Sequence, residues 1–113
     1  MSIEGEVFRI ADQEVNGYKL VITGNLLAED AGSLRKFIEN CLKSQFTQLY
    51  IDAKNIKEVD LTGINEIIHS SYTLKNAGKE LTFVYRQNSE IEAWVEKTGL
   101  DKFMATAIIS ENS

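Results

Sequence analysis

The sequence of 113 residues contains no proline, a single cysteine and a single histidine. With Cys41 alone, an internal disulfide is impossible, and such cysteine usage is typical of a reducing compartment. No apolar run approaches the roughly 18 residues of a membrane-spanning helix, and the start MSIEGEVFRI carries acids where an export signal needs bases. We therefore expect a cytoplasmic protein without direct membrane insertion. Without any linker-like segment, the length predicts one domain over residues 1–113.

The residue clusters that catalysis and cofactor binding need are also missing. The seven glycines are scattered, so there is no phosphate-binding P-loop and no dinucleotide fingerprint. His69 is the only partner for Cys41, so neither a metal cluster nor a nucleophile with its base can be assembled. We expect no enzyme activity, no metal and no cofactor. The net charge of −5 argues against binding to nucleic acid or to an anionic membrane.

Hydrophobic periodicity predicts strands that alternate with helices. The expected elements are two strands within residues 6–23 joined by a turn at 14–17, a helix over 28–43, a strand over 49–53, a helix over 61–76, a strand over 81–85, a helix over 89–97, a helical turn over 100–104 and an optional edge strand over 107–109. This order indicates an α/β fold with a mixed, mainly parallel central sheet of four to five strands and about four helices. We expect Gly24 and Asn25 to end the second strand, and both faces of strand 49–53 to be covered.

The cysteine falls within an apolar stripe of the helix over residues 28–43. That stripe consists of Leu34, Phe37, Ile38, Cys41 and Leu42. A small core residue is therefore the favoured interpretation of Cys41, in preference to a redox or nucleophilic thiol.

The helix over residues 61–76 has two contrasting sides. At about 100° per residue, one side gathers Ile64, Ile67, Ile68, Ser71, Leu74 and the stem of Lys75. The other side, here called the polar stripe, consists of Thr62, Asn65, Glu66, His69, Thr73 and Asn76. A solvated helix face is the simpler explanation of such a stripe, and a partner contact is the functional alternative.

The hydroxyl of Thr62 lies in the first turn of this helix. It could bond a free backbone N–H, but Asp60 can cap the helix instead and leave the Thr62 hydroxyl free. A phosphoryl group on Thr62 would face free N–H groups and the positive end of the helix dipole. Glu58, Asp60 and Glu66 would repel its added charge of about −1.5 to −2. Because these effects are comparable, we expect phosphorylation to change the surface more than the fold.

The stretch IDAKNIKEVDLTGI, residues 51–64, resembles the signature of STAS domains, found in bacterial anti-sigma-factor antagonists and sulphate-transporter tails. That signature is a strand ending in Asp, a short loop, then Asp-Ser-Ser/Thr-Gly-Leu opening a helix. Three more segments fit the family: VITGNL at 21–26 resembles its early strand and turn, GKEL at 78–81 its helix end and next strand, and TGLDKF at 98–103 its late Gly-Leu-x-x-x-Phe segment. The sequence departs from the pattern at Leu61, where a Ser is usual, and at Thr62, where Ser is commoner.

The resemblance implies a binding module controlled by phosphorylation in a signalling pathway that regulates transcription. In the antagonist family, a partner anti-sigma-factor kinase of the serine/threonine type phosphorylates the hydroxyl before the glycine, which corresponds to Thr62. We expect Asp60 to cap the helix and orient the turn, and Gly63 to keep its backbone approachable. The expected partner contact comprises Asp60, Leu61, Gly63, Asn65, Glu66, His69 and Thr73, on a monomer or weak dimer. The alternative is a constitutive subunit of a larger complex, such as a lipid-transport ABC complex or a stress-signalling assembly.

Overall fold

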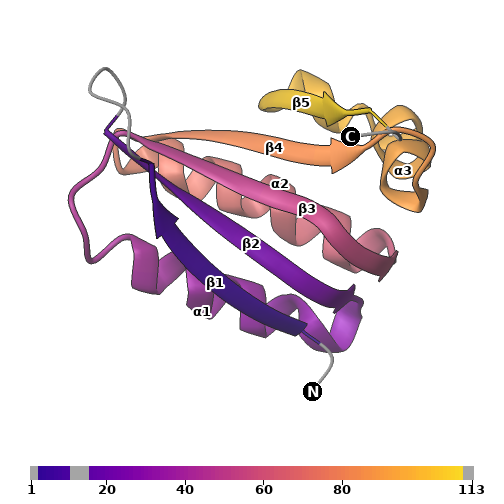
Figure 1. The fold of residues 1–113 in the computed structure, drawn as a ribbon, viewed down its shortest axis with the longest axis horizontal. Coiled ribbons are helices and arrows are strands. Elements are labelled where there is room, and N and C mark those ends of the chain that lie inside the picture. Colours follow the sequence, from indigo (N-terminus) through magenta and orange to yellow (C-terminus); the bar gives the residue numbers. More distant parts are fainter. Residues whose placement is uncertain (1–2, 11–15, 111–113) are drawn as a thin grey trace.

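The computed structural model describes residues 3–10 and 16–110, which form one sheet with helices on one side. The elements in chain order are β1 (Ile3–Arg9), β2 (Gly17–Leu26), the 3-10 turn η1 (Ala28–Asp30), α1 (Ala31–Cys41), β3 (Gln48–Val59), α2 (Leu61–Asn76), β4 (Glu80–Arg86), α3 (Glu90–Thr98), the 3-10 turn η2 (Leu100–Lys102) and β5 (Ala105–Ile109). The predicted α/β class is confirmed (Figure 1). Three α-helices and two 3-10 turns stand where about four helices were expected.

The five strands lie in the order β1-β2-β3-β4-β5, so each strand pairs with its neighbours in sequence. Only β1 and β2 are antiparallel, and the other three pairings are parallel. The predicted mixed, mainly parallel sheet is therefore confirmed, including the edge strand β5. Part of the predicted turn at residues 14–17 lies outside the described residues.

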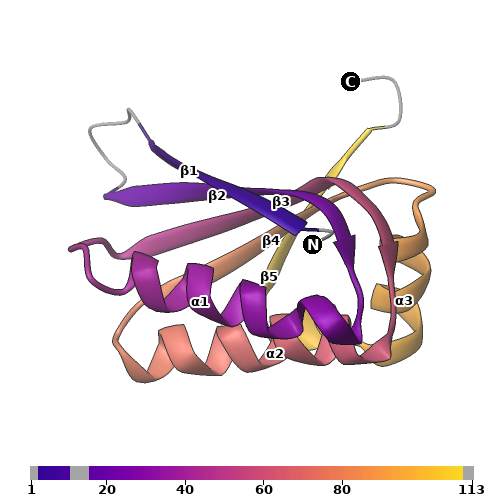
Figure 2. The same ribbon diagram turned by 90° about the horizontal axis from the view of Figure 1, so that it is seen from below.

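One face of the sheet is covered by helices, and α1 and α2 run side by side along it (Figure 2). Each parallel crossover returns to the next strand in the same direction, so right-handed connections place their helices on the same face. The expectation that strand 49–53 is covered on both faces is therefore wrong. Tyr50 is only half-buried, whereas its neighbours Leu49 and Ile51 are 0% and 1% exposed.

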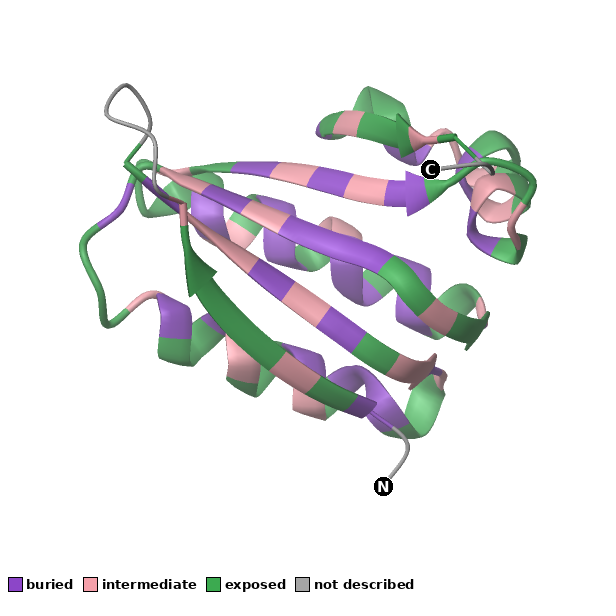
Figure 3. Ribbon diagram, viewed as in Figure 1, coloured by how far each residue is buried: buried purple, intermediate pink, exposed green. Residues whose placement is uncertain are grey.

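The core lies between this covered face and the helices. Its fully buried members come from strands and helices alike and include Leu20, Ile22, Leu34, Leu49, Ile51, Ile64, Ile67, Leu74 and Phe83. Buried and more exposed residues alternate along β4 and through the middle of β2, residues 20–23 (Figure 3), as expected for strands with one covered face. Cys41 belongs to this core and is 5% exposed, so its predicted structural placement is confirmed.

Strands β2 and β3 both run further than predicted. Gly24 does not end β2; it adopts φ 114° within the strand, where the pairing with β3 shifts register before Leu26. Likewise β3 continues to Val59, although residues 54–58 are mostly polar. The polar residues stay in the strand because β3 remains paired with β2 as far as Val59. The pairing of β3 with β4 already ends at Asp52. This extension delivers Asp60 to the end of β2.

The helix ends follow from local sequence. Gly78, with φ 77°, ends α2 as predicted, while the N–H groups of Gly78 and Lys79 donate to the last free carbonyls of that helix. Ser89 caps α3 by accepting a hydrogen bond from the N–H of Glu92, and Gly99, with φ 70°, ends it. Local sequence therefore fixes the end of α2 and both ends of α3.

Candidate partner-binding site at the start of α2

Asp60 links the crossover that contains α1 to the crossover that contains α2, at one end of the sheet. Its Oδ1 accepts a hydrogen bond of 2.9 Å from the N–H of Gly63, which is the predicted helix cap. Its Oδ2 accepts a second bond of 2.9 Å from the N–H of Ala28, which precedes α1. One carboxylate thus ties the start of α2 to the segment that leads into α1, and both of its oxygens are occupied by backbone groups.

Gly63 has a structural role that the sequence did not indicate. It is buried, and a Cβ built on it would lie 2.1 Å from the carbonyl oxygen of Leu26. Only a glycine lets the first turn of α2 approach the end of β2 so closely. The expectation that Gly63 keeps its backbone open to a partner is therefore wrong, because the side of Gly63 from which a Cβ would project faces β2.

Leu61 and Thr62 form the exposed part of this turn. The Leu61 side chain is 50% exposed, and Thr62 is exposed as well. Within the part of the chain that the structure describes, the Thr62 hydroxyl has no hydrogen bond, because Asp60 already caps the helix. The first turn of α2 contains no acidic residue, so nothing within it opposes an anion at the positive end of the helix dipole.

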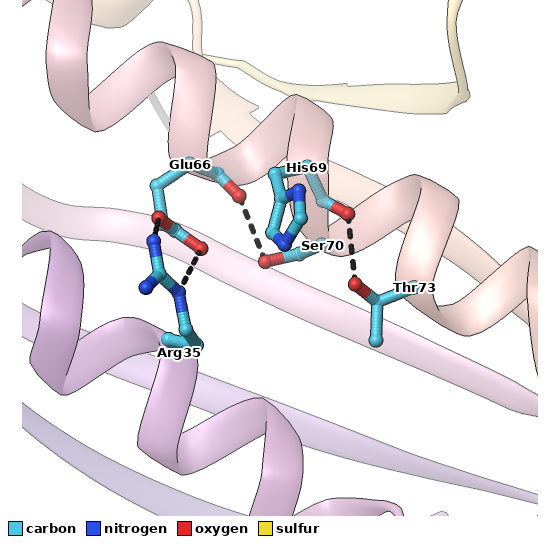
Figure 4. Close-up of polar contacts among 5 residues, drawn as sticks. All are labelled: Arg35, Glu66, His69, Ser70 and Thr73. Atoms are coloured by element: carbon cyan, nitrogen blue, oxygen red, sulfur yellow. Dashed lines mark hydrogen bonds and ion pairs between the residues drawn. The ribbon is translucent and has the colours of Figure 1, made fainter.

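Glu66 lies one turn further along α2. Its place in the polar stripe predicted an exposed side chain, but the structure buries it. Its side chain is 5% exposed and meets Arg35 of α1 through two hydrogen bonds, 2.7 Å from Nη2 to Oε1 and 3.3 Å from Nε to Oε2 (Figure 4). The Arg35 side chain is 56% exposed, and its hydrogen bond and attraction to Glu66 raise the pKa of the guanidinium. The exposed group at this point is therefore the guanidinium of an ion pair, while the carboxylate is covered.

The remainder of the polar stripe is divided between solvent and the helix itself. Asn65 and His69 are exposed, while Thr73 is half-buried and donates a hydrogen bond of 3.1 Å to the carbonyl of His69 (Figure 4). Ser70, which does not belong to the stripe, is buried and donates to the carbonyl of Glu66 at 2.8 Å. The groups free to meet a partner are thus Leu61, Thr62, Asn65, His69 and the guanidinium of Arg35.

Arg35 is the residue that sequence reasoning missed. A carboxylate is seldom fully buried without a cationic partner, so burial of Glu66 would have called for one. The partner comes from a position 31 residues earlier, however, and no local pattern links the two. Only the packing of α1 beside α2 reveals the pair.

The described residues contain no group of three or more side chains suited to hold a metal ion. Burial raises the pKa of the Cys41 thiol, which lowers its nucleophilicity at neutral pH. Among the same residues, no helix is both long and apolar enough to cross a membrane. What this surface offers is therefore an exposed hydroxyl, an apolar side chain and polar groups suited to a protein contact.

Comparison with known proteins gives a family and a fold. The family model described as STAS domain matches residues 9–112. No curated protein matches the sequence. An anti-sigma factor antagonist from Mycobacterium paratuberculosis has a similar structure, with a TM-score of 0.77 and 18% identity over 93% of this chain and 85% of that one.

Two structures of SpoIIAA extend the comparison. The anti-sigma factor antagonist SpoIIAA in its unphosphorylated form gives a TM-score of 0.70 and 11% identity, covering 92% of this chain and 88% of that chain. The Bacillus cell fate determinant SpoIIAA in its phosphorylated form gives a TM-score of 0.61 and 12% identity, covering 92% and 91%. At these identities the likeness establishes the fold.

Proposed function

Because this chain belongs to the STAS domain family, we propose that it is a binding module of the anti-sigma-factor-antagonist type, controlled by phosphorylation of Thr62. The partner is a serine/threonine kinase of the anti-sigma-factor kind, and the contact is made in the cytoplasm. The module performs no chemistry of its own. The kinase transfers the γ-phosphoryl group of ATP to the Thr62 oxygen: the bond from the γ-phosphorus to the bridging oxygen of ADP breaks, ADP leaves, and the hydroxyl proton is released.

The observation that supports this proposal is that Asp60 caps α2, while the hydroxyl of Thr62 is left exposed. Asp60 accepts the N–H of Gly63 and the N–H of Ala28, so the start of α2 is held without help from Thr62. Thr62 is exposed and has no hydrogen bond to the described residues. Its hydroxyl is accessible to a kinase and can be modified without loss of the helix cap.

A phosphate at Thr62 acts on the partner through charge. It adds about −1.5 to −2 charges to a small exposed surface made of Leu61, Asn65 and His69. A partner fitted to a neutral, partly apolar turn must then desolvate that charge, which weakens the contact. The relative SpoIIAA is known in a phosphorylated and an unphosphorylated form, which is consistent with such control.

The experiment is mass spectrometry of the protein purified from its native cells, combined with affinity measurement against the co-purifying kinase. We expect phosphate on Thr62 and none on Thr62→Ala. Thr62→Asp should bind the kinase more weakly than the unmodified protein. Asn40→Asp adds the same charge on an exposed residue near the far end of α1 and should bind as the unmodified protein does. Equal affinities for Thr62→Asp and Asn40→Asp would rule out control at this turn.

A constitutive subunit of a larger complex is the second candidate. It is favoured by one observation: Leu61 exposes half of an apolar side chain beside Thr62, and permanent interfaces are more apolar than transient ones. On this reading Leu61→Ser disrupts a stable complex, transporter subunits or a stress-signalling assembly co-purify, and Thr62 has no phosphate under growth or stress.

A further inference from the structure

The sheet face opposite α1 and α2 carries no helix among the described residues (Figure 2). Side chains alternate along a strand, so the neighbours of the buried Leu20 and Ile22 in β2 point to this open face. These are Lys19 and Val21, and their pairing partners Phe8 in β1 and Asp52 in β3 share the face with them. This region is separate from the start of α2, so an inference about it goes beyond the proposed function.

A concavity of about 580 Å³ lies on this face, over β1, β2 and β3. Its lining includes the apolar side chains of Phe8 and Val21, the cations Arg9, Lys19 and Lys54, and the acid Glu6. Phe8 is 48% exposed, which leaves a large aromatic surface facing water. A volume of this size is within the range of sites for small organic molecules.

A buried carboxylate positions the two lysines. Asp52 is 2% exposed although it lies on the open face, and its Oδ1 accepts the N–H of Lys54 at 3.1 Å. Its Oδ2 is 3.6 Å from Nζ of Lys19 and 3.6 Å from Nζ of Lys54. The two nitrogens are therefore no more than twice that distance apart.

The two ammonium groups keep their hydrogen-bond donors available. At 3.6 Å the attraction to Asp52 is that of an ion pair, because the separation is too long for a hydrogen bond. Within the described part of the chain neither ammonium has a hydrogen bond. The side chains of Lys19 and Lys54 remain 42% and 39% exposed. Two ammonium groups are thus held close together by Asp52, and neither donates a hydrogen bond to the described residues.

The charge of the concavity indicates the class of ligand. Among the described residues, its three cations stand against two carboxylates, Glu6 in the lining and the buried Asp52 beside the lysines, in a chain whose net charge is −5. The local excess of one positive charge is balanced by a monoanion. A polyanion such as nucleic acid would meet two carboxylates here and few cations. The exposed aromatic surface of Phe8 favours a ligand that also has an apolar body, because that body would cover the ring.

We propose that this concavity binds a small organic monocarboxylate with an apolar body. Its carboxylate accepts hydrogen bonds from Lys19 and Lys54, and its body lies against Phe8 and Val21. Arg9 adds to the local positive charge. The STAS fold then presents two surfaces, one at the start of α2 and one on the open face of the sheet.

The test is titration of the whole chain with 2-naphthoate, followed by calorimetry and by amide chemical shifts in two-dimensional NMR. The matched neutral probe is 2-naphthamide, which keeps the aromatic body and lacks the charge. We expect saturable binding of 2-naphthoate that weakens as salt rises, with shifts confined to residues 6–10, 19–23 and 52–55. Lys19→Gln and Lys54→Gln should each weaken binding about two- to fivefold, the range of a partly exposed ion pair.

Two further variants complete the design. Lys36→Gln removes an exposed lysine of α1, on the other side of the molecule, and should leave the affinity unchanged. Arg9→Gln does not touch Asp52, so it tests the charge of the site even if the lysine variants unfold. The proposal is overturned if binding of 2-naphthoate does not reach saturation in the millimolar range, or if 2-naphthamide binds as tightly as 2-naphthoate. It is also overturned if Arg9→Gln and Lys36→Gln have the same affinity for 2-naphthoate. Shifts that centre instead on the groove between α2 and β5, lined by Lys75 and Phe103, overturn it too.

Discussion

Arg35 and Glu66 form the polar link between the two helices that cover the sheet. The guanidinium of Arg35 donates two hydrogen bonds to a carboxylate whose side chain is 5% exposed. That carboxylate has been removed from water, and the guanidinium is the cation that compensates it among the described residues. The pair fixes the helices at the level of the exposed turn that contains Thr62.

We predict that Arg35→Met lowers stability and that adding Glu66→Met restores most of it. The single change leaves a buried carboxylate without its cation, whereas the double change replaces the pair with apolar groups. Urea denaturation of the two variants measures the difference. Arg86→Met removes an arginine that is exposed at the end of β4 and serves as the control. A double variant no more stable than Arg35→Met alone would mean that the pair is not what holds Glu66.

Gly63 and Gly32 provide a matched pair of substitutions. A Cβ at Gly63 would lie 2.1 Å from the Leu26 carbonyl oxygen, whereas a Cβ at Gly32 would meet nothing within 4 Å. Gly63→Ala should therefore destabilise the protein by about 1–3 kcal/mol or more, as overpacking does. Gly32→Ala should be neutral or stabilise by up to about 1 kcal/mol, because alanine favours a helix. Thermal and urea unfolding of both variants test this, and equal effects would contradict the close approach of α2 to β2.

Asp60 should show a graded response to substitution. Asp60→Ala removes both backbone bonds and should cost about 2 kcal/mol, at the upper end of the range for a lost helix cap. Asp60→Asn keeps one acceptor oxygen, so it can satisfy the N–H of Gly63 or that of Ala28 but not both. Its loss of stability should lie between those of the alanine variant and the unmodified protein. Hydrogen exchange at the amides of Ala28 and Gly63 in Asp60→Asn identifies which hydrogen bond survives. Protection of both amides in Asp60→Ala would contradict the role of Asp60 as their shared acceptor.

The thiol of Cys41 should react slowly with iodoacetamide in the folded protein. It is 5% exposed, and burial raises its pKa, so a smaller fraction is thiolate at any given pH than in the unfolded chain. The alkylation rate should therefore begin to rise at a higher pH for the folded protein than for the protein in urea. Alkylation rates across this pH series, followed by mass, test the prediction. A folded protein that reacts as fast as the unfolded one would place Cys41 outside the core.

The parts of the site that are local in sequence could be predicted, and those that depend on packing could not. The cap by Asp60 involves residues three apart, so the sequence alone suffices to place it. The burial of Glu66 depends on Arg35 in α1, and the burial of Gly63 depends on Leu26 at the end of β2, so both depend on residues more than 30 positions earlier in the chain. Helical periodicity placed Glu66 on the polar side correctly, but that side is partly covered by α1.

The same reasoning applies to the sheet. Alternating strands and helices predicted the α/β class, because each element is encoded by its own periodicity. The open face could not be foreseen from the strand over residues 49–53, whose apolar content resembles that of a doubly covered strand. Its exposure follows from the strand order, which places all the crossover helices on one side.

Thr62→Asp should separate partner binding from stability. An acid in the first turn is favoured by the helix dipole by about 0.3–1 kcal/mol. Glu58, Asp60 and Glu66 lie close in sequence, but Glu66 is already neutralised by Arg35, so their opposing effect is of similar size or smaller. We therefore expect the free energy of unfolding to stay within about 1 kcal/mol of that of the unmodified protein. The affinity for the proposed partner kinase should fall in the same variant. A loss of affinity that accompanies a large loss of stability would instead mean that the substitution damages the turn, so urea denaturation must be measured beside every binding experiment at Thr62.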